Sequence, residues 1–399
     1  MPFLSKLSLL TCDSTDIKSS TLPTKVFCRC SLIKGPSSLV AQHSLDPGSG
    51  QHTGEVTMHR NGTICTFQFP RPSPFHSLVF LCSVSILGKF LVLHTLLLLF
   101  DLHRSGFNGN TDAELCSRWM QLSAFFPFYR NHNVLTADSQ EPYRWASVAS
   151  ATRTAMHIRY SLLPYMYTLF HEAHTTGSTV MRALAWEFPN EPQLAGVDTQ
   201  FLLGPNILVT PVLEPQVDTV KGVFPGVVDG EVWYDWYTGG KVEAQAGVNT
   251  TISAPLGHIP VFVRGGSILP LQEPGYTTTE SRNNPWGLIV ALSDDGEACG
   301  SLYVDDGESL EPSATLYVEF SVKDCMLRAE VKGNYADTNA IANVTVMGVF
   351  DRVGEVMMNE QAVDEGNVDY DQDSGVLKLV RLNDLTRGGA WKQGWTISW

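Results

Sequence analysis

From Gly177 to the C-terminus, the sequence is a series of short apolar runs separated by Pro and Gly residues. Turn dipeptides lie between the runs, which recur roughly every 8–15 residues, as in antiparallel sandwiches. Residues 178–399 are therefore predicted to be mostly β, in two sandwiches with a boundary near residue 270. The expected strands lie within Phe201–Leu213, Glu231–Tyr237, Ile259–Leu269, Trp286–Leu292, Ser301–Val304, Leu316–Val322, Asn343–Val349 and Leu377–Leu382. The turn dipeptides are Asp229-Gly230, Gly239-Gly240, Asp306-Gly307 and Glu365-Gly366.

Two helices are predicted before this region. Asn110–Glu114 supplies an N-cap and early acidic residues for the first helix, which Pro127 ends. Its apolar stripe is Leu115, Trp119, Leu122 and Phe126. The second helix runs from about Ala146 to Thr176, with a kink at Pro164 and a stop at Gly177.

Charge divides the chain into two parts. Residues 1–105 hold 9 basic and 5 acidic residues, whereas the rest holds 18 and 36. The acidic excess argues against a nucleic-acid partner, because phosphate binding needs a basic face, and is compatible with a neutral substrate such as a sugar. Five of the eight cysteines also lie in the first part, so the two parts differ in origin.

Residues 1–105 are predicted to be mostly irregular, because they are rich in Ser and Thr and lack a sustained hydrophobic period. The apolar run near Met1 is too short for a secretory signal, which needs ~7–15 residues. Residues 78–100 are long enough to cross a bilayer, but Lys89 interrupts them, and a central Lys costs roughly 2.5–3.5 kcal/mol. A membrane anchor and a buried segment both remain open.

Two acidic clusters, Asp294-Asp295 and Asp305–Glu308, were considered for acid–base chemistry. Neighbouring residues on a strand point to opposite faces, so tandem acids make a poor acid–base pair. Solvated hairpin turns explain both clusters better. The sequence also lacks a nucleophile elbow, a phosphate loop, a dinucleotide fingerprint and a trusted metal-ligand spacing.

The run FFPFYRNHN (125–133) places aromatic residues beside many hydrogen-bonding side chains. Proteins bind sugars in this way, with ring faces against aromatics and hydroxyls against polar groups. A capped helix end with a buried histidine is the other interpretation, and the spacing alone favours it.

This run belongs to an ordered series of motifs that resembles the C-terminal part of glycoside hydrolase family 31, above all its secreted fungal α-glucosidases. The resemblance covers about residues 106–399, roughly three quarters of the chain. The other motifs are QEPYRW (140–145), RYSLLPYMYTLFHEAH (159–174), RALAWEFP (182–189), LLGPNILVTPVL (202–213), VWYDWYTG (232–239), HIPVFVRGGSILPLQ (258–272), TTTESR (277–282) and GSLYVDDGES (300–309).

The resemblance implies the end of a (β/α)8 barrel followed by two β-sandwich domains. Residues 106–177 would be the last part of the barrel, with its seventh helix and last strand within 106–133 and its last helix over 146–176. A proximal β-sandwich (178–270) and a distal β-domain (271–399) would follow. Residues 1–105 match nothing in the family.

The family's catalytic residues, two Asp on earlier barrel strands, are not expected in this chain. The nucleophile motif Trp-x-Asp-Met-Asn-Glu is absent, and Met358-Asn359-Glu360 resembles only its end. The acid–base motif, an Asp after Trp-x-Gly, is absent too. The resemblance implies a retaining mechanism through a glycosyl-enzyme intermediate, with no cofactor and no metal.

The match begins at Gly106. Family members read Gly-Ala-Asp-Val-Cys-Gly-Phe there, whereas this chain has His103 in place of the Asp and Ser105 in place of the Cys. Cys116, which would pair with that Cys, is therefore expected to lack its partner. A truncated or frame-shifted gene, with non-native sequence over 1–105, explains this break.

Two binding residues carry over from the family. His132 corresponds to the His that hydrogen-bonds the sugar in the −1 subsite, and Phe107 to an aromatic near the +1 subsite. Asn249 and Asn343 are expected to be glycosylated, since each begins an Asn-x-Thr sequon and the family members are secreted. The parent enzyme is thus expected to be extracellular.

The expected function is an α-glucosidase-like hydrolase that releases glucose from non-reducing α-linked ends of oligosaccharides. Because both catalytic motifs are absent, this chain is expected to be an inactive fragment by itself. Two alternatives stay open. One is a non-catalytic, β-rich remnant that binds carbohydrate weakly or not at all, and the other is an α-xylosidase of the same family.

Overall fold

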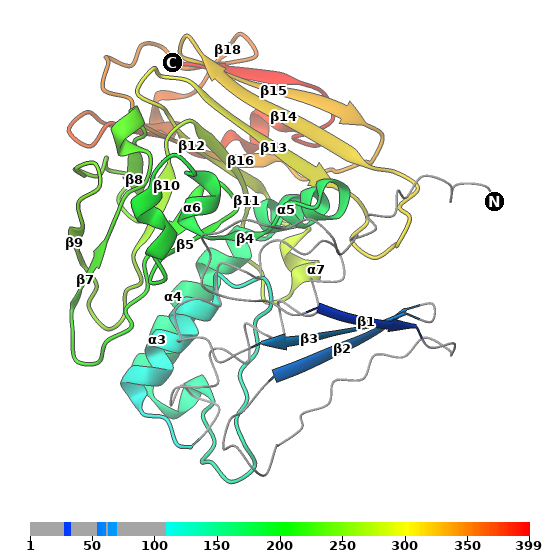
Figure 1. Ribbon diagram of the computed structural model, residues 1–399. Coiled ribbons are helices and arrows are strands. Elements are labelled where there is room, and N and C mark those ends of the chain that lie inside the picture. The colour runs from blue at the N-terminus through cyan, green and yellow to red at the C-terminus, as the bar shows by residue number, and fades with distance from the viewer. Residues whose placement is uncertain (1–27, 33–53, 61–62, 70–108) are drawn as a thin grey trace, which may run out of the picture. The chain divides into compact units, whose positions relative to one another are not determined.

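The computed structural model describes residues 28–32, 54–60, 63–69 and 109–399 (Figure 1). The chain forms two compact units, 1–77 and 78–399. In the first unit, three strands pair antiparallel in the order β1-β3-β2. They are β1 (Cys28–Leu32), β2 (Gly54–Arg60) and β3 (Thr63–Phe69).

Strands are thus described at 28–32, 54–60 and 63–69, and a mostly irregular character for residues 1–105 as a whole stays a prediction. Asn61-Gly62 lies between β2 and β3 in the sequence and is a strong hairpin dipeptide. The candidate membrane segment 78–100 lies outside the described residues, among which no helix is long and apolar enough to cross a membrane.

Within residues 109–399, three α-helices are longer than ten residues and two are single turns. The helices are α3 (Ala113–Ser123), α4 (Ala146–Ser161), α5 (Leu163–Thr176) and the single turns α6 (Leu184–Glu187) and α7 (Thr278–Ser281). Short 3-10 turns cover Pro142–Arg144, Pro192–Gly196, Val227–Asp229, Glu365–Asn367 and Leu382–Thr386.

The helix boundaries follow local chemistry. Asp112 caps α3 by accepting a hydrogen bond from the backbone N–H of Leu115 at 2.9 Å. The predicted second helix is two helices divided at Leu162, because Pro164 has no N–H to continue the ladder. Gly177 ends α5 in the left-handed region at φ +83°, as the sequence predicted.

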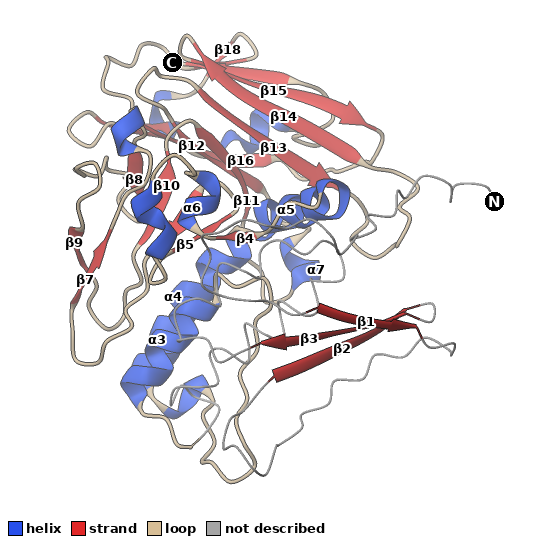
Figure 2. Ribbon diagram, viewed as in Figure 1, coloured by secondary structure: helices blue, strands red, loops and turns tan. Residues whose placement is uncertain are grey.

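The buried face of α3 differs from the predicted stripe. Leu115 and Trp119 are only partly buried, whereas Cys116 and Met120 are buried against Val148 of α4. Leu122 of the predicted stripe is buried, and Trp119 and Phe126 pack against the same core. The buried face is therefore wider than predicted, because α3 also packs along α4 (Figure 2).

The expected last barrel strand within 106–133 is not formed in the part of this segment that the structure describes. Residues 124–140 contain neither helix nor strand. A barrel strand is held by hydrogen bonds to neighbours on both sides, and among the described residues no strand pairs with this segment. Side-chain hydrogen bonds hold it instead.

A five-stranded sheet follows in the order β4-β5-β6-β10-β8, with the pair β7-β9 beside it. The strands are β4 (Met181–Arg182), β5 (Phe201–Leu203), β6 (Ile207–Val209), β7 (Thr219–Gly222), β8 (Trp233–Asp235), β9 (Thr250–Ser253) and β10 (Val261–Arg264). The predicted strand Phe201–Leu213 is thus a hairpin, turned by Gly204 at φ +59°. Its side chains alternate between two cores, Leu203 and Ile207 on one face, Leu202 and Leu208 on the other.

The remaining strands form one eleven-stranded sheet, in the order β18-β17-β21-β15-β14-β13-β11-β12-β16-β20-β19. They are β11 (Ser267–Gln272), β12 (Trp286–Ala291), β13 (Ala298–Val304), β14 (Leu316–Lys323), β15 (Met326–Gly333), β16 (Ile341–Met347), β17 (Met357–Met358), β18 (Gln361–Ala362), β19 (Val368–Asp371), β20 (Val376–Leu379) and β21 (Trp395–Ser398). The pairs β11–β13 and β12–β16 are parallel, which corrects the prediction of purely antiparallel sheets.

This sheet is a sandwich because its two halves enclose one core. Strands β11 and β13 meet through the single pair Ser267 and Cys299. Apolar residues of β13, β14, β15 and β21 pack there against those of β11, β12, β16 and β20. Figure 1 shows β13, β14 and β15 as one layer in front of β12 and β16.

Strand β12 belongs to two cores at once. Leu288 and Val290 point into the sandwich core, whereas Ile289 and Ala291 point into a second core that contains residues of α4, α5 and the five-stranded sheet. A strand buried on both faces reads as a continuous apolar run, which explains the sequence of Trp286–Ala291. The expected boundary at 270 falls within β11, and the three-part division of 106–399 stays a prediction.

Candidate functional site

The aromatic and polar run 125–133 leaves the C-terminal end of α3, where Arg159 of α4 holds it. Its guanidinium donates to the carbonyls of Ala124 at 2.7 Å and Phe126 at 2.6 Å. It also lies 5.6 Å from the centroid of the Tyr129 ring. Burial lowers the pKa of Arg159. The last carbonyls of a helix lack hydrogen-bond donors within the helix, and here the Arg159 guanidinium is the donor at the end of α3.

A pair of side-chain amides closes the next loop. The Asn131 amide donates to the carbonyl of Gln140 at 3.1 Å, and the Gln140 amide donates back to Oδ1 of Asn131 at 2.7 Å. Gln140 also donates to the carbonyl of His132 at 3.4 Å. The Asn133 amide donates to the carbonyl of Asp138 at 2.6 Å. The backbone on both sides of His132 is therefore fixed by side chains rather than by a sheet.

His132 itself has an exposed side chain on this loop, which rules out the alternative of a buried core histidine. Phe107, the other expected sugar-binding residue, lies outside the described residues. Asn110 lies three residues after it and bonds Asp138, with its amide 2.6 Å from Oδ2 and its Oδ1 2.8 Å from the backbone N. The two subsite assignments stay predictions.

The acidic clusters behave only partly as expected. Asp294 lies in a turn and pairs with Lys241 at 3.2 Å. Asp306 also caps a turn, and its bonds to Ser309 lower the pKa of its carboxyl to about 2. Asp305, expected in a solvated turn, is instead 5% exposed and accepts a hydrogen bond from Tyr167 of α5 at 2.7 Å. It links α5 to the sandwich.

Cys116 and the possible metal ligands form no reactive site in the part of the chain that the structure describes. Cys116 is a buried free thiol, and burial raises its pKa to about 11. Its Sγ lies 3.7 Å from the carbonyl of Gln140. Across the residues that the structure describes, no three His, Cys, Asp or Glu side chains gather as a metal site would require.

Both expected glycosylation residues are exposed. Asn249 lies in the loop before β9, and Asn343 lies on β16. Thr251 is exposed as well, and Thr345, which points to the same face of β16 as Asn343, is partly exposed.

Comparison with known proteins matches both parts of this arrangement. The family model for the glycosyl hydrolases family 31 TIM-barrel domain matches residues 103–169, and that for the glycosyl hydrolase family 31 C-terminal domain matches residues 177–269. The C-terminal three quarters of the chain belong to glycosyl hydrolase family 31. The fold there is the end of the TIM barrel followed by β-sandwich domains, as the sequence predicted.

Curated relatives are more than half identical to this chain over about three quarters of its length. An α-glucosidase of Aspergillus niger is 62% identical over 301 residues, which are 75% of this chain and 31% of that protein. Glucoamylase 1 of Schwanniomyces occidentalis is 56% identical over 74% of this chain and 30% of its own length. The chain thus spans about a third of the length of these relatives.

Solved structures agree with the fold. The glucosidase II α subunit, bound to α3-Glc2, has a TM-score of 0.64 and 26% identity, and the match covers 73% of this chain and 33% of that one. A family 31 dextranase of Flavobacterium johnsoniae in complex with isomaltotriose has a TM-score of 0.60 at 26% identity, over 72% of this chain and 37% of that one.

Sequence reasoning missed the residues that shape the His132 loop. In the sequence, Arg159 and Gln140 stand out only as members of longer motifs, although they make most of the hydrogen bonds to residues 124–132. A signal existed, since Arg159 would otherwise be a partly buried cation on α4 that needs acceptors. Its partners lie more than thirty residues earlier, which periodicity does not reveal.

Proposed function

We propose that this chain is the C-terminal part of a secreted α-glucosidase, which releases glucose from non-reducing α-linked ends of oligosaccharides. The observation that carries the proposal is the 62% identity to the A. niger α-glucosidase over 301 residues. The proposed reaction is a retaining double displacement. A carboxylate displaces the aglycone to form a glycosyl-enzyme, and a water molecule then releases the sugar.

Within this proposal, residues 106–140 contribute part of the sugar-binding wall. His132 would donate a hydrogen bond to a hydroxyl in the −1 subsite, and Phe107 would lie near the +1 subsite. The Asn131–Gln140 amide pair and the bonds of Arg159 support the assignment of His132, because they fix the backbone that carries it. Side chains held by a rigid scaffold lose less entropy when they bind a ligand.

The chain alone is expected to show no α-glucosidase activity, because the sequence contains neither catalytic Asp motif. Hydrolysis of maltose or nitrophenyl glucoside by the purified chain, compared with a heat-killed control, checks this. Turnover that a covalent cyclitol inhibitor abolishes would contradict it.

A chimera tests the parent activity. Residues 106–399 would replace the matching part of the A. niger enzyme, whose remaining part supplies the catalytic carboxylates. We expect maltose hydrolysis within about tenfold of that enzyme, because the two C-terminal parts are 62% identical. A folded but inactive chimera would favour the non-catalytic remnant.

In the chimera, His132→Ala is expected to lower kcat/KM by roughly tenfold to a thousandfold. His157→Ala, at an exposed histidine on α4, is the matched control and should leave it unchanged. If His132→Ala lowers the melting temperature while the folded fraction keeps its kcat/KM, then His132 supports the loop and does not bind sugar.

Two further parts of the proposal have their own tests. That the chain is a fragment of a longer enzyme is tested by translating the DNA upstream of codon 106, where an open frame with Trp-x-Asp-Met-Asn-Glu is expected. That it acts on glucosides rather than xylosides is tested by comparing nitrophenyl α-glucoside and nitrophenyl α-xyloside as substrates of the chimera, with faster glucoside hydrolysis expected. A family 31 α-xylosidase of Xanthomonas citri is also similar, with a TM-score of 0.51 and 26% identity over 59% of this chain and 25% of that one.

A further inference from the structure

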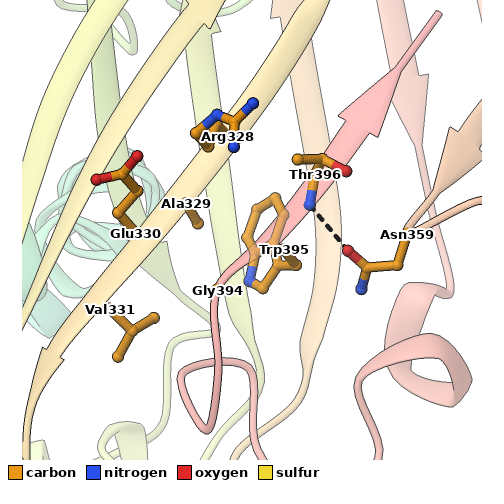
Figure 3. Close-up of a pocket in the computed structure, with 8 residues that line it drawn as sticks. All are labelled: Arg328, Ala329, Glu330, Val331, Asn359, Gly394, Trp395 and Thr396. Carbon is orange, nitrogen blue, oxygen red and sulfur yellow. Dashed lines mark hydrogen bonds between the residues drawn. The ribbon is translucent and has the colours of Figure 1, made fainter.

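A pocket of about 390 Å³ lies on the distal sandwich, where β21 separates from β15 (Figure 3). The last residue pair between these strands is Ala329 and Trp395. Gly394 precedes it and allows a close approach, since a Cβ there would lie 2.8 Å from the carbonyl O of Ala329. The pocket is an open, shallow depression on the surface and not an enclosed cleft.

Four polar side chains line this pocket, from β15, from β21 and from the turn between β17 and β18: Arg328, Glu330, Thr396 and Asn359. Arg328 and Glu330 lie on β15, where their side chains share one face and are exposed. In the described part of the chain, neither of them forms an ion pair. Within the described residues, the guanidinium of Arg328 makes one weak hydrogen bond, 3.9 Å to Sδ of Met326. Both groups therefore have hydrogen-bonding capacity to offer a ligand.

Asn359 lines the pocket from the turn between β17 and β18. Its Oδ1 accepts from the backbone N–H of Thr396 at 2.9 Å (Figure 3). The backbone N–H of Asn359 donates to the Thr396 carbonyl at 3.0 Å. These bonds fix the residue and occupy its side-chain oxygen with a protein donor. The amide nitrogen is the donor that remains for a ligand.

The chemistry of this lining selects a neutral ligand with several hydroxyls. The guanidinium of Arg328 and the carboxylate of Glu330 cancel in charge, so the pocket favours neither an anion nor a cation. Planar groups that donate and accept in pairs suit vicinal hydroxyls. Glu330 is the one carboxylate among the eight lining residues, so the lining lacks the second carboxylate that glycoside hydrolysis requires.

We propose that this pocket is a second saccharide site, which holds a sugar unit of a neutral α-linked oligosaccharide without cleaving it. None of residues 124–140 lines it, so it is separate from the His132 loop. The choice of α-linked glucose rests on the proposed function. A site of this kind would keep a long substrate close to the enzyme after each cleavage and raise its effective concentration at the active site.

The test is calorimetric titration of the full chain with maltotriose. Saturable binding is expected, and Arg328→Ala and Glu330→Gln should each weaken it by at least tenfold. Asn359→Asp keeps an acceptor for Thr396, removes the amide donor and adds a negative charge beside Glu330, so it should weaken binding of a neutral sugar as well. Arg352→Ala and Glu355→Gln, at exposed residues that do not line the pocket, are the matched controls and should bind as the parent does.

Several outcomes would overturn the proposal. They are the absence of binding, binding that all three pocket variants retain, binding that only His132→Ala removes, and tighter binding of glucuronate than of maltotriose. Unchanged melting temperatures of the variants ensure that lost binding is not lost folding. An inactive chimera would refute the proposed function and leave this titration intact, because no catalytic residue takes part in it.

Discussion

At the scale of single residues, His171 has the most informative surroundings. Its ring stacks on Tyr303 of β13 with centroids 3.7 Å apart, and it meets the edge of Tyr317 of β14 at 5.6 Å. Burial lowers the pKa of His171, and the nearby His174 lowers it further, while Asp305 opposes both. Folding therefore favours the neutral imidazole at the contact between α5 and the sandwich.

This predicts a loss of stability in weak acid. The folded pKa of His171 lies below the unfolded value of about 6.5. The contribution of His171 to folding stability is therefore complete above pH 6.5 and is lost as the pH falls from there through the folded pKa. His171→Phe keeps an aromatic ring and removes the titration, so its melting temperature should fall less than that of the parent between pH 7 and pH 5. His174→Gln is the control, with a smaller effect. Parallel pH curves for the parent and His171→Phe would refute the idea.

At the scale of elements, Arg118 attaches α3 to the loops of the five-stranded sheet. Its guanidinium donates to the carbonyls of Val217 and Ala254, each at 3.0 Å, Pro255 at 3.1 Å and His258 at 3.3 Å. Glu114, one turn earlier, accepts from the backbone N–H of Gln216 at 2.7 Å. One helix face thus replaces the backbone partners that two loops lack.

Arg118→Ala should lower the free energy of unfolding by about 1–3 kcal/mol, because it leaves the part-buried carbonyls of Ala254 and His258 unpaired. Arg118→Lys should recover only part of the loss, since a single ammonium cannot reach acceptors in two directions. The urea midpoint of the purified chain is the measurement. Arg153→Ala, at an exposed arginine on α4, is the control, and equal midpoints for the two alanine variants would contradict the prediction.

The sequence predicted elements where local rules decide them. The break at Pro164, the stop at Gly177 and the strand at Trp286–Ala291 all follow from one residue or one apolar run. It failed where a distant partner decides, as for the burial of Asp305. It also missed strand β15, although Met326–Gly333 alternates exposed and buried residues and follows β14 through a tight turn, which is a local strand signal.

In the candidate site, too, the sequence predicted what local residues decide and missed what distant contacts decide. The residue types around His132 are enough to identify the motif from the sequence. The hydrogen bonds by which Gln140 and Arg159 hold its backbone depend on contacts that only the folded structure shows. Asp305 was misplaced for the same reason, because Tyr167, which covers it, lies 138 residues earlier. Composition predicted an exposed acid, and tertiary packing buried it.

At the scale of the whole molecule, we propose that the native protein is secreted and carries N-linked glycans at Asn249 and Asn343. The full-length protein from a fungal host should lose mass on endoglycosidase treatment. Thr251→Ala and Thr345→Ala should each remove one glycan, whereas Ser253→Ala, outside both sequons, should remove none. Treatment that leaves the mass unchanged would count against secretion through the glycosylating pathway.

Strand β12 has a consequence for how the second unit comes apart. Its side chains alternate between the sandwich core and the core shared with α4 and α5, so neither core can open without exposing one face of the same six residues. Heating should therefore melt residues 109–399 in one calorimetric transition rather than two. A proteolytic cut inside β11, at the end of the proximal part, would release no stable half, because each product would carry an uncovered apolar face.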